Sequence, residues 1–349
     1  MVENSRFFRG EFVRLSVPSV VLAEASWYGS LRAGWESNAD GQAGVVDNGS
    51  RWGIKGSSEA SEGLTAVYRF ETKINSSNAS SPGGRLSYVG LSGGFGTVTI
   101  GQVWSASYNH FGGVVDQGHK FSDSETTFRP SNTISYAVNV GSVSFQADIS
   151  GNPGGGWSET VSGDTATAED KDIDASQFGA TMALGENGKI ALAHINDDGH
   201  KDTSKKRSYV AGEYTVGGMT MWLGFAQAKA KDDRSYAPTD TAGSITLAAG
   251  KSYDEERKDK TTFYGIRGGL GDTGASFALV ARSKKATGDR VTNVDGTLTD
   301  GDTPANKHSP WLLSLSRSLG GGASVHLEHA NPDMDKEKSS TYLGLKVDF

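Results

Sequence analysis

Apolar and polar residues alternate with a period of two along most of the chain. In the segment 142-SVSFQADI-149 every second residue is apolar, beginning with Val143, and the residues between are polar. The segments 64-LTAVYRFE-71, 274-GASFALVAR-282 and 322-GASVHLEH-329 show the same alternation. This period predicts strands with one face in an apolar medium. No segment of residues 26–349 shows the 3.6-residue repeat of an amphipathic helix.

Short turns and long polar loops alternate between these segments. The short connections are 57-SSEASEG-63, 93-GGFG-96, 140-VGS-142, 185-GENG-188, 216-VGGM-219, 270-LGDTG-274 and 319-LGGGA-323. The long ones are residues 37–48, 75–84, 105–130, 151–172, 197–204, 231–257, 285–307 and 331–338. Seven turns and eight loops separate sixteen predicted strands, which begin near Trp27, Ser50, Leu64, Arg85, Phe95, Ser131, Ser142, Asp174, Gly188, Lys205, Met219, Lys258, Thr273, His308, Gly322 and Ser339.

This arrangement gives every strand one tight end and one end with a long loop. Such segregation is typical of a transmembrane β-barrel, with short periplasmic turns, long external loops and an even number of strands. Closure of the sheet also leaves no edge strand whose backbone N–H and C=O groups would lack hydrogen-bond partners in lipid. A ring of sixteen strands encloses an aqueous channel rather than a filled core. We therefore predict an all-β, antiparallel, up-and-down transmembrane barrel as one domain over residues 26–349.

The last predicted strand is apolar on one face up to the final residue. In 341-TYLGLKVDF-349, Leu343, Leu345, Val347 and Phe349 alternate with polar residues and glycine. A chain end normally frays unless it is held in place. We expect this strand to close the barrel against the first one, with Phe349 in an aromatic belt at the periplasmic interface.

Composition narrows the function classes. Apolar residues make up 36% of the chain, which suits a sheet with one wet face, and the 47 glycines accompany only 8 prolines. The net charge of −7 and the absence of a Lys/Arg run argue against nucleic-acid binding. The chain has no cysteine, which excludes disulfides, thiolate metal sites and cysteine nucleophiles.

The first 25 residues have the pattern of a secretory leader. Arg6, Arg9 and Arg14 precede the apolar run 15-LSVPSVVLAEA-25, which ends in an A-x-A site. We expect cleavage after Ala25, although Glu11 and Pro18 depart from the pattern. No stretch reaches 18 apolar residues, so the sequence predicts no transmembrane helix.

In this order and spacing, several motifs resemble those of the Gram-negative general porins, a trimeric outer-membrane family with sixteen strands. They are 28-YGSLRAG-34, 50-SRWGIKG-56, 88-YVGLSGGFGTVTIGQ-102, 108-YNHFGGVVD-116, 129-RPSNTISY-136 and the terminal run from Tyr342 to Phe349. The resemblance implies a homotrimer, a third loop (105–130) folded into the lumen as a constriction, and contact with lipid and lipopolysaccharide. It also implies that Phe349 is part of the signal read by the barrel-assembly machinery.

The resemblance places acidic residues of the third loop opposite a wall of basic side chains. Arg51 and Arg129 match the family's basic wall, and strand alternation adds Arg32 and Arg69 as lumen-facing candidates. Gln102 stands where many members carry an arginine. Its alternation directs it to lipid unless Gly101 introduces a bulge. Opposite charges across a narrow aqueous gap create a transverse field that favours small hydrophilic solutes and ions.

The predicted constriction loop is less acidic than the resemblance would lead one to expect. His110 precedes Phe111-Gly112-Gly113 where the family often has an acid, which leaves Asp116, Asp123 and Glu125 as the acidic residues. We therefore expect no strong cation selectivity. Two roles for His110 remain open: titration near pH 6.5 that alters conductance, or packing against the wall.

Three functions stay open: a passive diffusion porin, a channel on the same barrel that prefers organic anions, and a secreted all-β binding protein. We expect no enzyme activity and no cofactor, because the G-x-S-x-G match at Gly90–Gly94 precedes a strand instead of the helix that a nucleophile elbow requires. We also expect no metal site at His326, Glu328 and His329, since alternation points His329 away from the other two.

Overall fold

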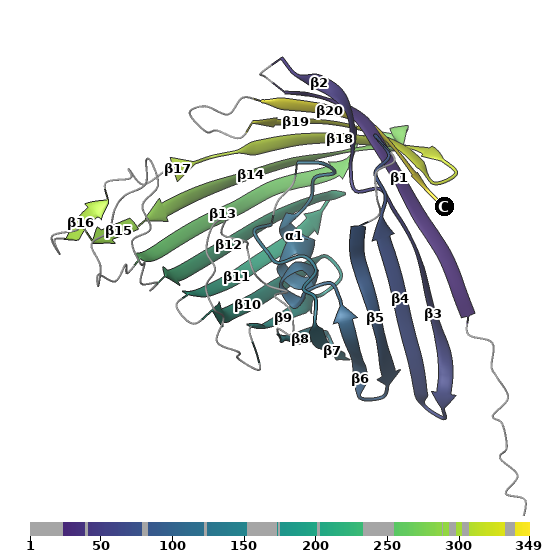
Figure 1. Cartoon of the computed structure of the whole chain (residues 1–349). Helices are drawn as coiled ribbons and strands as arrows, with labels where there is room; N and C mark the ends of the chain where they lie inside the picture. The colour runs from purple at the N-terminus through teal and green to yellow at the C-terminus, as the bar shows by residue number, and fades with distance from the viewer. Residues whose placement is uncertain are drawn as a thin grey trace, which may run out of the picture.

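The computed structural model describes residues 24–38, 41–78, 83–121, 124–151, 173, 175–200, 203–232, 255–287, 289–292, 298–301, 307–331 and 339–349. Sixteen long antiparallel strands in this part of the chain close into one barrel (Figure 1). They are β1 (Glu24–Asn38), β3 (Arg51–Ser61), β4 (Leu64–Lys73), β5 (Gly83–Gly93), β6 (Gly96–Gln102), β7 (Thr133–Val140), β8 (Val143–Ser150), β9 (Ala175–Leu184), β10 (Gly188–His200), β11 (Thr203–Val216), β12 (Met219–Asp232), β13 (Glu255–Gly269), β14 (Ala275–Thr287), β18 (Trp311–Gly320), β19 (Ala323–Asn331) and β20 (Ser340–Asp348).

The barrel closes between its first and last strands. β1 pairs with β20 from Ser30 opposite Asp348 to Asn38 opposite Ser340. Its other edge pairs first with β3 and then with the short strand β2 (Ala43–Asp47) of the first loop. At the short-turn end, Gly29 N donates to Phe349 O at 2.8 Å, and Phe349 N donates to Gly29 O at 3.1 Å. The closing strand predicted from the terminal alternation is therefore confirmed.

Three further short strands and three short helical segments accompany these sixteen strands. β15 (Asp289–Thr292) and β16 (Leu298–Gly301) form a separate hairpin, and β17 (Lys307–His308) extends the edge of β14. The third loop contains the π-helical turn η1 (Tyr108–Gly112) and α1 (Gly113–Val115), and a 3-10 turn, η2 (Gly271–Thr273), lies between β13 and β14. In the described residues, no helix has the length and apolarity needed to cross a membrane.

Side chains alternate between the two faces of the wall, and β12 shows this most regularly. Met221, Leu223 and Phe225 point outward and are 47–48% exposed, whereas Trp222 and Ala226 point inward and are at most 9% exposed. A soluble barrel would have polar side chains on its outer face, whereas this outer face carries exposed apolar ones. The outer face is thus suited to lipid.

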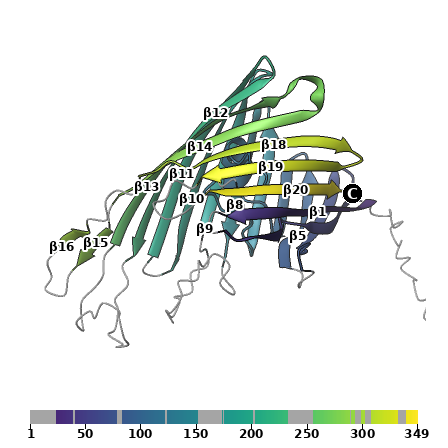
Figure 2. The same ribbon diagram turned by 90° about the horizontal axis from the view of Figure 1, so that it is seen from above.

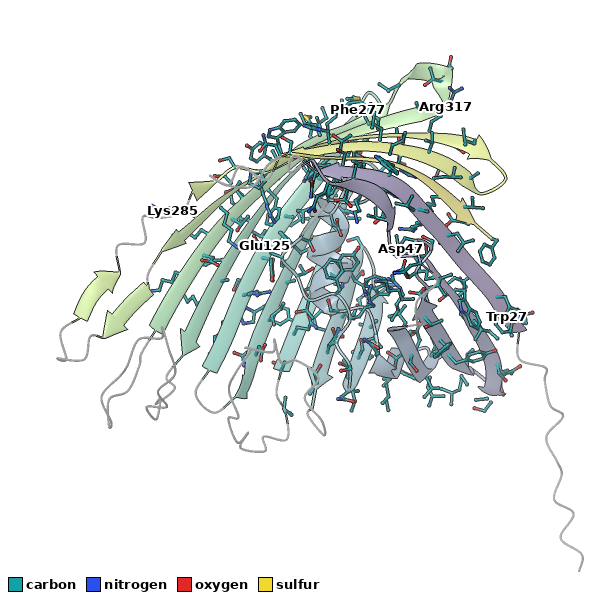
Figure 3. The ribbon with its side chains drawn as sticks, turned by 45° about the horizontal axis from the view of Figure 1, so that its top comes forward. Trp27, Asp47, Glu125, Phe277, Lys285 and Arg317 are labelled. Atoms are coloured by element: carbon teal, nitrogen blue, oxygen red, sulfur yellow. The ribbon has the colours of Figure 1, made fainter. Side chains whose placement is uncertain are left out.

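The short connections gather at one end of the barrel, so the strand ends that the long loops join lie at the other (Figures 1 and 2). On β14, Phe277 lies near the short-turn end together with Arg317 of β18, while Lys285 lies near the other end (Figure 3). Glycines with positive φ make these tight turns possible, as at Gly63 (73°) between β3 and β4.

The predicted fold class and all sixteen strands are confirmed, and the observed strand starts differ from the predicted ones by at most three residues, as at Glu24 against Trp27. The predicted loop 197–204 is an exception, because strand continues to His200 and resumes at Thr203. The predicted turn 57–63 is likewise mostly strand, since β3 reaches Ser61. Residues 1–23 lie outside the described part, and the leader stays a prediction.

Candidate functional site

The third loop, between β6 and β7, enters the interior of the barrel, as predicted. Its helical turns lie inside the ring of strands (Figure 1). Phe111, Val114 and Val115 are fully buried there against inward-facing side chains of β10 to β13: Ala191, Ala193, Ile195, Tyr209, Ala211, Trp222, Ala226 and Phe263. Burying such side chains contributes roughly 1.5–3 kcal/mol each. This apolar patch, on a face expected to be wet, fixes the loop to the wall.

Glycines on the wall make room for this contact. A Cβ atom on Gly224 of β12 would lie 2.9 Å from Val115 Cγ1, and one on Gly179 of β9 would lie 2.5 Å from His110 Cδ2. Because real Cβ atoms do not approach other atoms this closely, a larger residue at either position would displace the loop. These two glycines therefore form part of the surface on which the loop packs, because they have no side chain.

Polar groups hold the first half of the loop. Asp148 of β8 accepts a hydrogen bond of 2.6 Å from Ala106 N, and Gln146 Nε2 donates to Trp104 O at 2.9 Å. His110 Nδ1 lies 2.8 Å from Thr181 Oγ1. Burial lowers the pKa of His110 to about 4. This ring therefore packs against the wall in its neutral form.

Glu125 joins the second half of the loop to the wall opposite the predicted basic one. It adopts a left-handed backbone conformation with φ of 56°. Its carboxylate accepts hydrogen bonds from Thr261 Oγ1 at 3.0 Å and Lys284 Nζ at 3.2 Å, and Arg282 Nη1 lies 3.7 Å away. Two cations thus neutralise Glu125, and Figure 3 shows it inside the barrel in front of these strands.

Glu328 of β19 provides a further anchor. Its carboxylate is fully buried and accepts the backbone N–H groups of His119, Lys120 (2.6 Å) and Phe121 (3.1 Å). The ring of His119 stacks on that of His326 with centroids 3.6 Å apart. Burial, followed by the charge of His326, lowers the pKa of His119 to about 3. His329 faces away toward Thr341 Oγ1 at 2.8 Å.

Four arginines on β1, β3, β4 and β5 line the wall across from the docked helical turns, and three of them converge on Glu71. Arg85 Nε donates to Glu71 Oε1 at 2.6 Å, and Arg69 Nη2 donates to Glu71 Oε2 at 3.0 Å. Arg51 Nε lies 3.9 Å from the same carboxylate. The hydroxyl of Tyr28 donates to Glu71 Oε2 at 2.9 Å and accepts from Arg69 Nε at 2.7 Å.

Arg32 and Arg129 extend this wall without a direct bond to Glu71. Arg32 Nε donates to Ser30 Oγ at 2.9 Å. Arg129 lies in the loop four residues before β7, where its guanidinium is 4.8 Å from the centroid of Trp104. Burial, then the charge of Arg85, lowers the pKa of Arg129 to about 10, so it still carries a positive charge at neutral pH.

The loop presents an aromatic column toward these arginines, and Asp116 lies beside one of its rings. Tyr108 stacks on Trp104 with centroids 4.8 Å apart and contacts Phe128 at 4.7 Å. Burial, together with the charge and hydrogen bond of Asp116, raises the pKa of Tyr108 to about 12, and the charges of Arg129 and Arg51 oppose that rise. Tyr108 thus lies close enough to the basic wall to interact with it electrostatically.

The predicted site residues therefore fall into three groups. Arg32, Arg51, Arg69 and Arg129 lie together on the wall, and Asp116 lies beside Tyr108 on the loop, whereas His110 and Glu125 serve as anchors elsewhere. Asp123 lies outside the described residues. Gln102 reaches back into the protein, with Nε2 donating to Arg129 O at 3.3 Å beside Gly101, whose φ is 136°.

Sequence reasoning missed Arg85 and Glu71. Strict alternation with the outward-facing Val89 and Leu91 directs Arg85 to lipid, but the β4–β5 register shifts between Glu71 and Thr72. That bulge turns Arg85 to the inner face. The signal available in the sequence was the pair Gly83-Gly84 just before it, because glycine inside a strand often marks a bulge.

Comparisons with known proteins agree with this architecture. Residues 13–290 match a family described as Gram-negative porin. An outer membrane porin protein of Bordetella pertussis is 26% identical over 302 residues, which cover 82% of this chain and 68% of that protein. The major outer membrane protein P.IB of Neisseria meningitidis is 33% identical over 101 residues, 25% of this chain and 30% of its own length. The chain thus aligns with less than a third of that relative.

Solved structures share the fold at low identity. An anion-selective porin from Comamonas acidovorans superposes with a TM-score of 0.65 at 16% identity, covering 94% of this chain and 100% of that one. OmpT of Vibrio cholerae, in its trimer form, gives 0.68 at 10% identity, covering 94% and 99%. At these identities the likeness concerns the fold alone.

Proposed function

The chain belongs to the Gram-negative porin family, and from that premise we propose that it forms a water-filled channel in the outer membrane of a Gram-negative bacterium. Small hydrophilic solutes and ions would diffuse through it passively. The closed barrel, its lipid-suited outer face and the loop folded into its interior support this function. The family and the relatives' names favour a channel rather than an enzyme.

The observation that carries the proposal is the charge balance at the constriction. The arginines at positions 32, 51, 69, 85 and 129 share one wall with the carboxylate of Glu71. Of the acids on the described part of the loop, Glu125 is bound to Lys284 and Arg282, and Asp116 lies beside Tyr108. A net positive gap between low-dielectric walls attracts anions and repels cations. The channel should therefore prefer anions.

Planar-bilayer recording tests both parts of this proposal. The detergent-purified full chain should give ohmic, non-saturating current steps in KCl. In a tenfold KCl gradient, the sign of the reversal potential should show that chloride is more permeant than potassium. Current steps in groups of three would support the homotrimer that we propose. A folded, inserted protein without current steps would contradict the channel, whereas a potassium-selective reversal potential would contradict the anion preference alone.

The other proposed partners follow the family resemblance. We propose that the barrel contacts outer-membrane lipid and lipopolysaccharide, and that Phe349 belongs to the signal read by the barrel-assembly machinery. The ring of Phe349 is 67% exposed and lies over Gly29, where a Cβ atom would be 2.2 Å from it. An exposed aromatic ring at the short-turn end is available for such recognition.

A preference for organic anions is the second candidate. It is favoured by the aromatic column of Trp104, Tyr108 and Phe128 beside Arg129, because Phe128 is 37% exposed and offers an apolar surface next to a cation. Benzoate and cyclohexanecarboxylate carry the same charge on rings of similar size. Chloride current that falls saturably with benzoate, and less with cyclohexanecarboxylate, would favour this candidate. Equal, linear effects of the two would favour the general channel.

A further inference from the structure

Lysine side chains gather on the outer face of the barrel, near the long-loop ends of β11 to β14. On β12, Lys229 follows Phe225 and Gln227 on the outward face and is exposed. The sheet register places Lys229 directly opposite Lys206 on one side and Lys258 on the other. Nothing about the solute pathway explains this row, because these side chains point away from the lumen.

A second row lies one outward position closer to the middle of the barrel. Gln227 is opposite Lys260, which is in turn opposite Lys285. We call Lys206, Lys229, Lys258, Lys260 and Lys285 the lysine patch; all five are exposed. Lysines placed opposite one another repel, and such like-charge pairs destabilise a sheet. Within the part of the chain that the structure describes, no ion pair offsets the charge of Lys206, Lys229, Lys260 or Lys285.

The patch begins where the apolar outer surface of the same strands stops. Val210 is paired with Phe225, and both are exposed apolar residues. Successive outward residues lie about 7 Å apart along a strand, so Lys229 is roughly 13 Å beyond Phe225. That places the ammonium groups at the depth of lipid headgroups, which long lysine side chains can also reach along the wall.

On β6 to β8, the outward residues near the same ends of the strands are apolar instead of basic. Ile100, Ile134 and Ile149 form one cross-strand row on β6 to β8 and are 47–56% exposed. β6 ends at Gln102 and β7 begins at Thr133, so the outer face there remains apolar almost to the strand ends. Among the described residues, the exposed lysines of β11–β14 thus have no counterpart in the row on β6 to β8.

Resting on the outer-membrane location and lipid contact proposed above, we propose that the lysine patch binds the headgroup phosphates of a phosphorylated lipid in the outer leaflet. Phosphate oxygens supply a counter-charge to Lys206, Lys229, Lys260 and Lys285, and charge-assisted hydrogen bonds from lysine to phosphate are strong. Facing rows of ammonium groups can be bridged by one or two phosphates. The occupant is thus a lipid with more than one phosphate on its headgroup, held beside the barrel instead of inside it.

Native mass spectrometry of the full-length protein in detergent tests this site. Bisphosphorylated lipid A is added to the wild type and to the triple variant K206Q/K229Q/K260Q. The control triple variant K73Q/K189Q/K346Q makes the same change of net charge at positions away from the patch. We expect the first variant to bind lipid A about tenfold more weakly or worse. The control and the charge-preserving K206R/K229R/K260R should bind like the wild type.

Two further measurements make the outcome decisive. Monophosphorylated lipid A should bind the wild type less than the bisphosphorylated form, and millimolar inorganic phosphate should not displace it. Unchanged binding by K206Q/K229Q/K260Q, equal loss in the control, or displacement by free phosphate would overturn the proposal. Heat-modifiable migration in gels verifies that each variant is folded. Bilayer conductance need not change, so this result is independent of the proposed channel function.

Discussion

Arg85 Nε lies 2.6 Å from Glu71 Oε1, although strict alternation along β5 would have placed the arginine in lipid. Glu71 is 1% exposed and accepts from two arginines and a tyrosine. Its carboxylate holds guanidinium groups that would otherwise repel one another. Glu71 thereby positions the basic wall while reducing its net charge.

Replacing Glu71 with glutamine should separate these two effects. Glu71→Gln removes one negative charge, so the reversal potential should shift toward stronger anion preference. It also leaves the arginines without their common acceptor, which should lower the stability of the folded barrel by about 1–3 kcal/mol. Glu213→Gln is the matched control, because Glu213 binds Lys189 and Arg267 outside this cluster. Equal selectivity shifts in both variants would contradict the role of Glu71.

Arg85→Gln should weaken anion preference, since it removes the arginine with the shortest bond to Glu71 and allows that carboxylate to act on passing ions. The reversal potential in a salt gradient measures this effect. Arg317 is exposed near the short-turn end of β18 (Figure 3), and Arg317→Gln should leave the potential unchanged. A larger shift in the control than in Arg85→Gln would show that the wall does not set selectivity.

Phe111→Ala should loosen the constriction loop. The fully buried ring contacts Tyr209 and Phe263 at centroid distances of 4.8 and 5.5 Å, and its removal from a packed site costs about 3 kcal/mol. We expect larger and noisier single-channel currents. Phe225→Ala removes the same ring from the outer face, where it is 48% exposed, and should leave the currents as they are.

The two buried loop histidines predict how stability depends on pH. Burial lowers the pKa values of His110 and His119 to about 4 and about 3, below the ordinary value near 6.5. The unfolded chain therefore binds more protons in the intervening range, and stability is complete above about pH 6.5 and falls as the pH drops toward 4. Thermal unfolding across this range should show that decline, and His110→Gln should reduce its slope.

Conductance should respond differently from stability. Because His110 remains neutral above about pH 5, we expect single-channel conductance to be flat between pH 6 and 8. The alternative role in which this residue titrates near pH 6.5 would give a step in that range that His110→Gln abolishes. His194, within 3.0 Å of Ser208 Oγ on the outer face, provides the control substitution.

The barrel can be predicted well from the sequence because the two patterns that indicate it, alternation within strands and glycine-rich turns, are local. Period-two alternation identifies strands such as β12, and glycine-rich turns such as the one at Gly217 and Gly218 mark the tight ends. Arg51 and Arg69 could be assigned to the lumen by counting from their outward neighbours. These inferences need no knowledge of distant contacts.

The parts that escaped prediction depend on contacts between distant segments. Arg85 required a bulge whose position is set by pairing with β4. Trp222 and Phe263 look like lipid-facing residues by type, yet they face inward, where the loop packs on them. Glu125 was expected opposite the arginines, but a left-handed turn directs it to the far wall instead. Alternation along single strands contains none of this information.

The pairing of β1 with β20 has a kinetic consequence. Ser30 cannot meet Asp348 until nearly the whole chain is available, so the ring closes with one of the most non-local contacts the sequence allows. Loop-closure entropy makes such contacts slow to form. Until then β1 and β20 are open edges with unsatisfied backbone groups, and each would pair readily with a strand of another chain. The period before closure is therefore when this protein is most exposed to aggregation, and when a factor that holds β1 or β20 would protect it most.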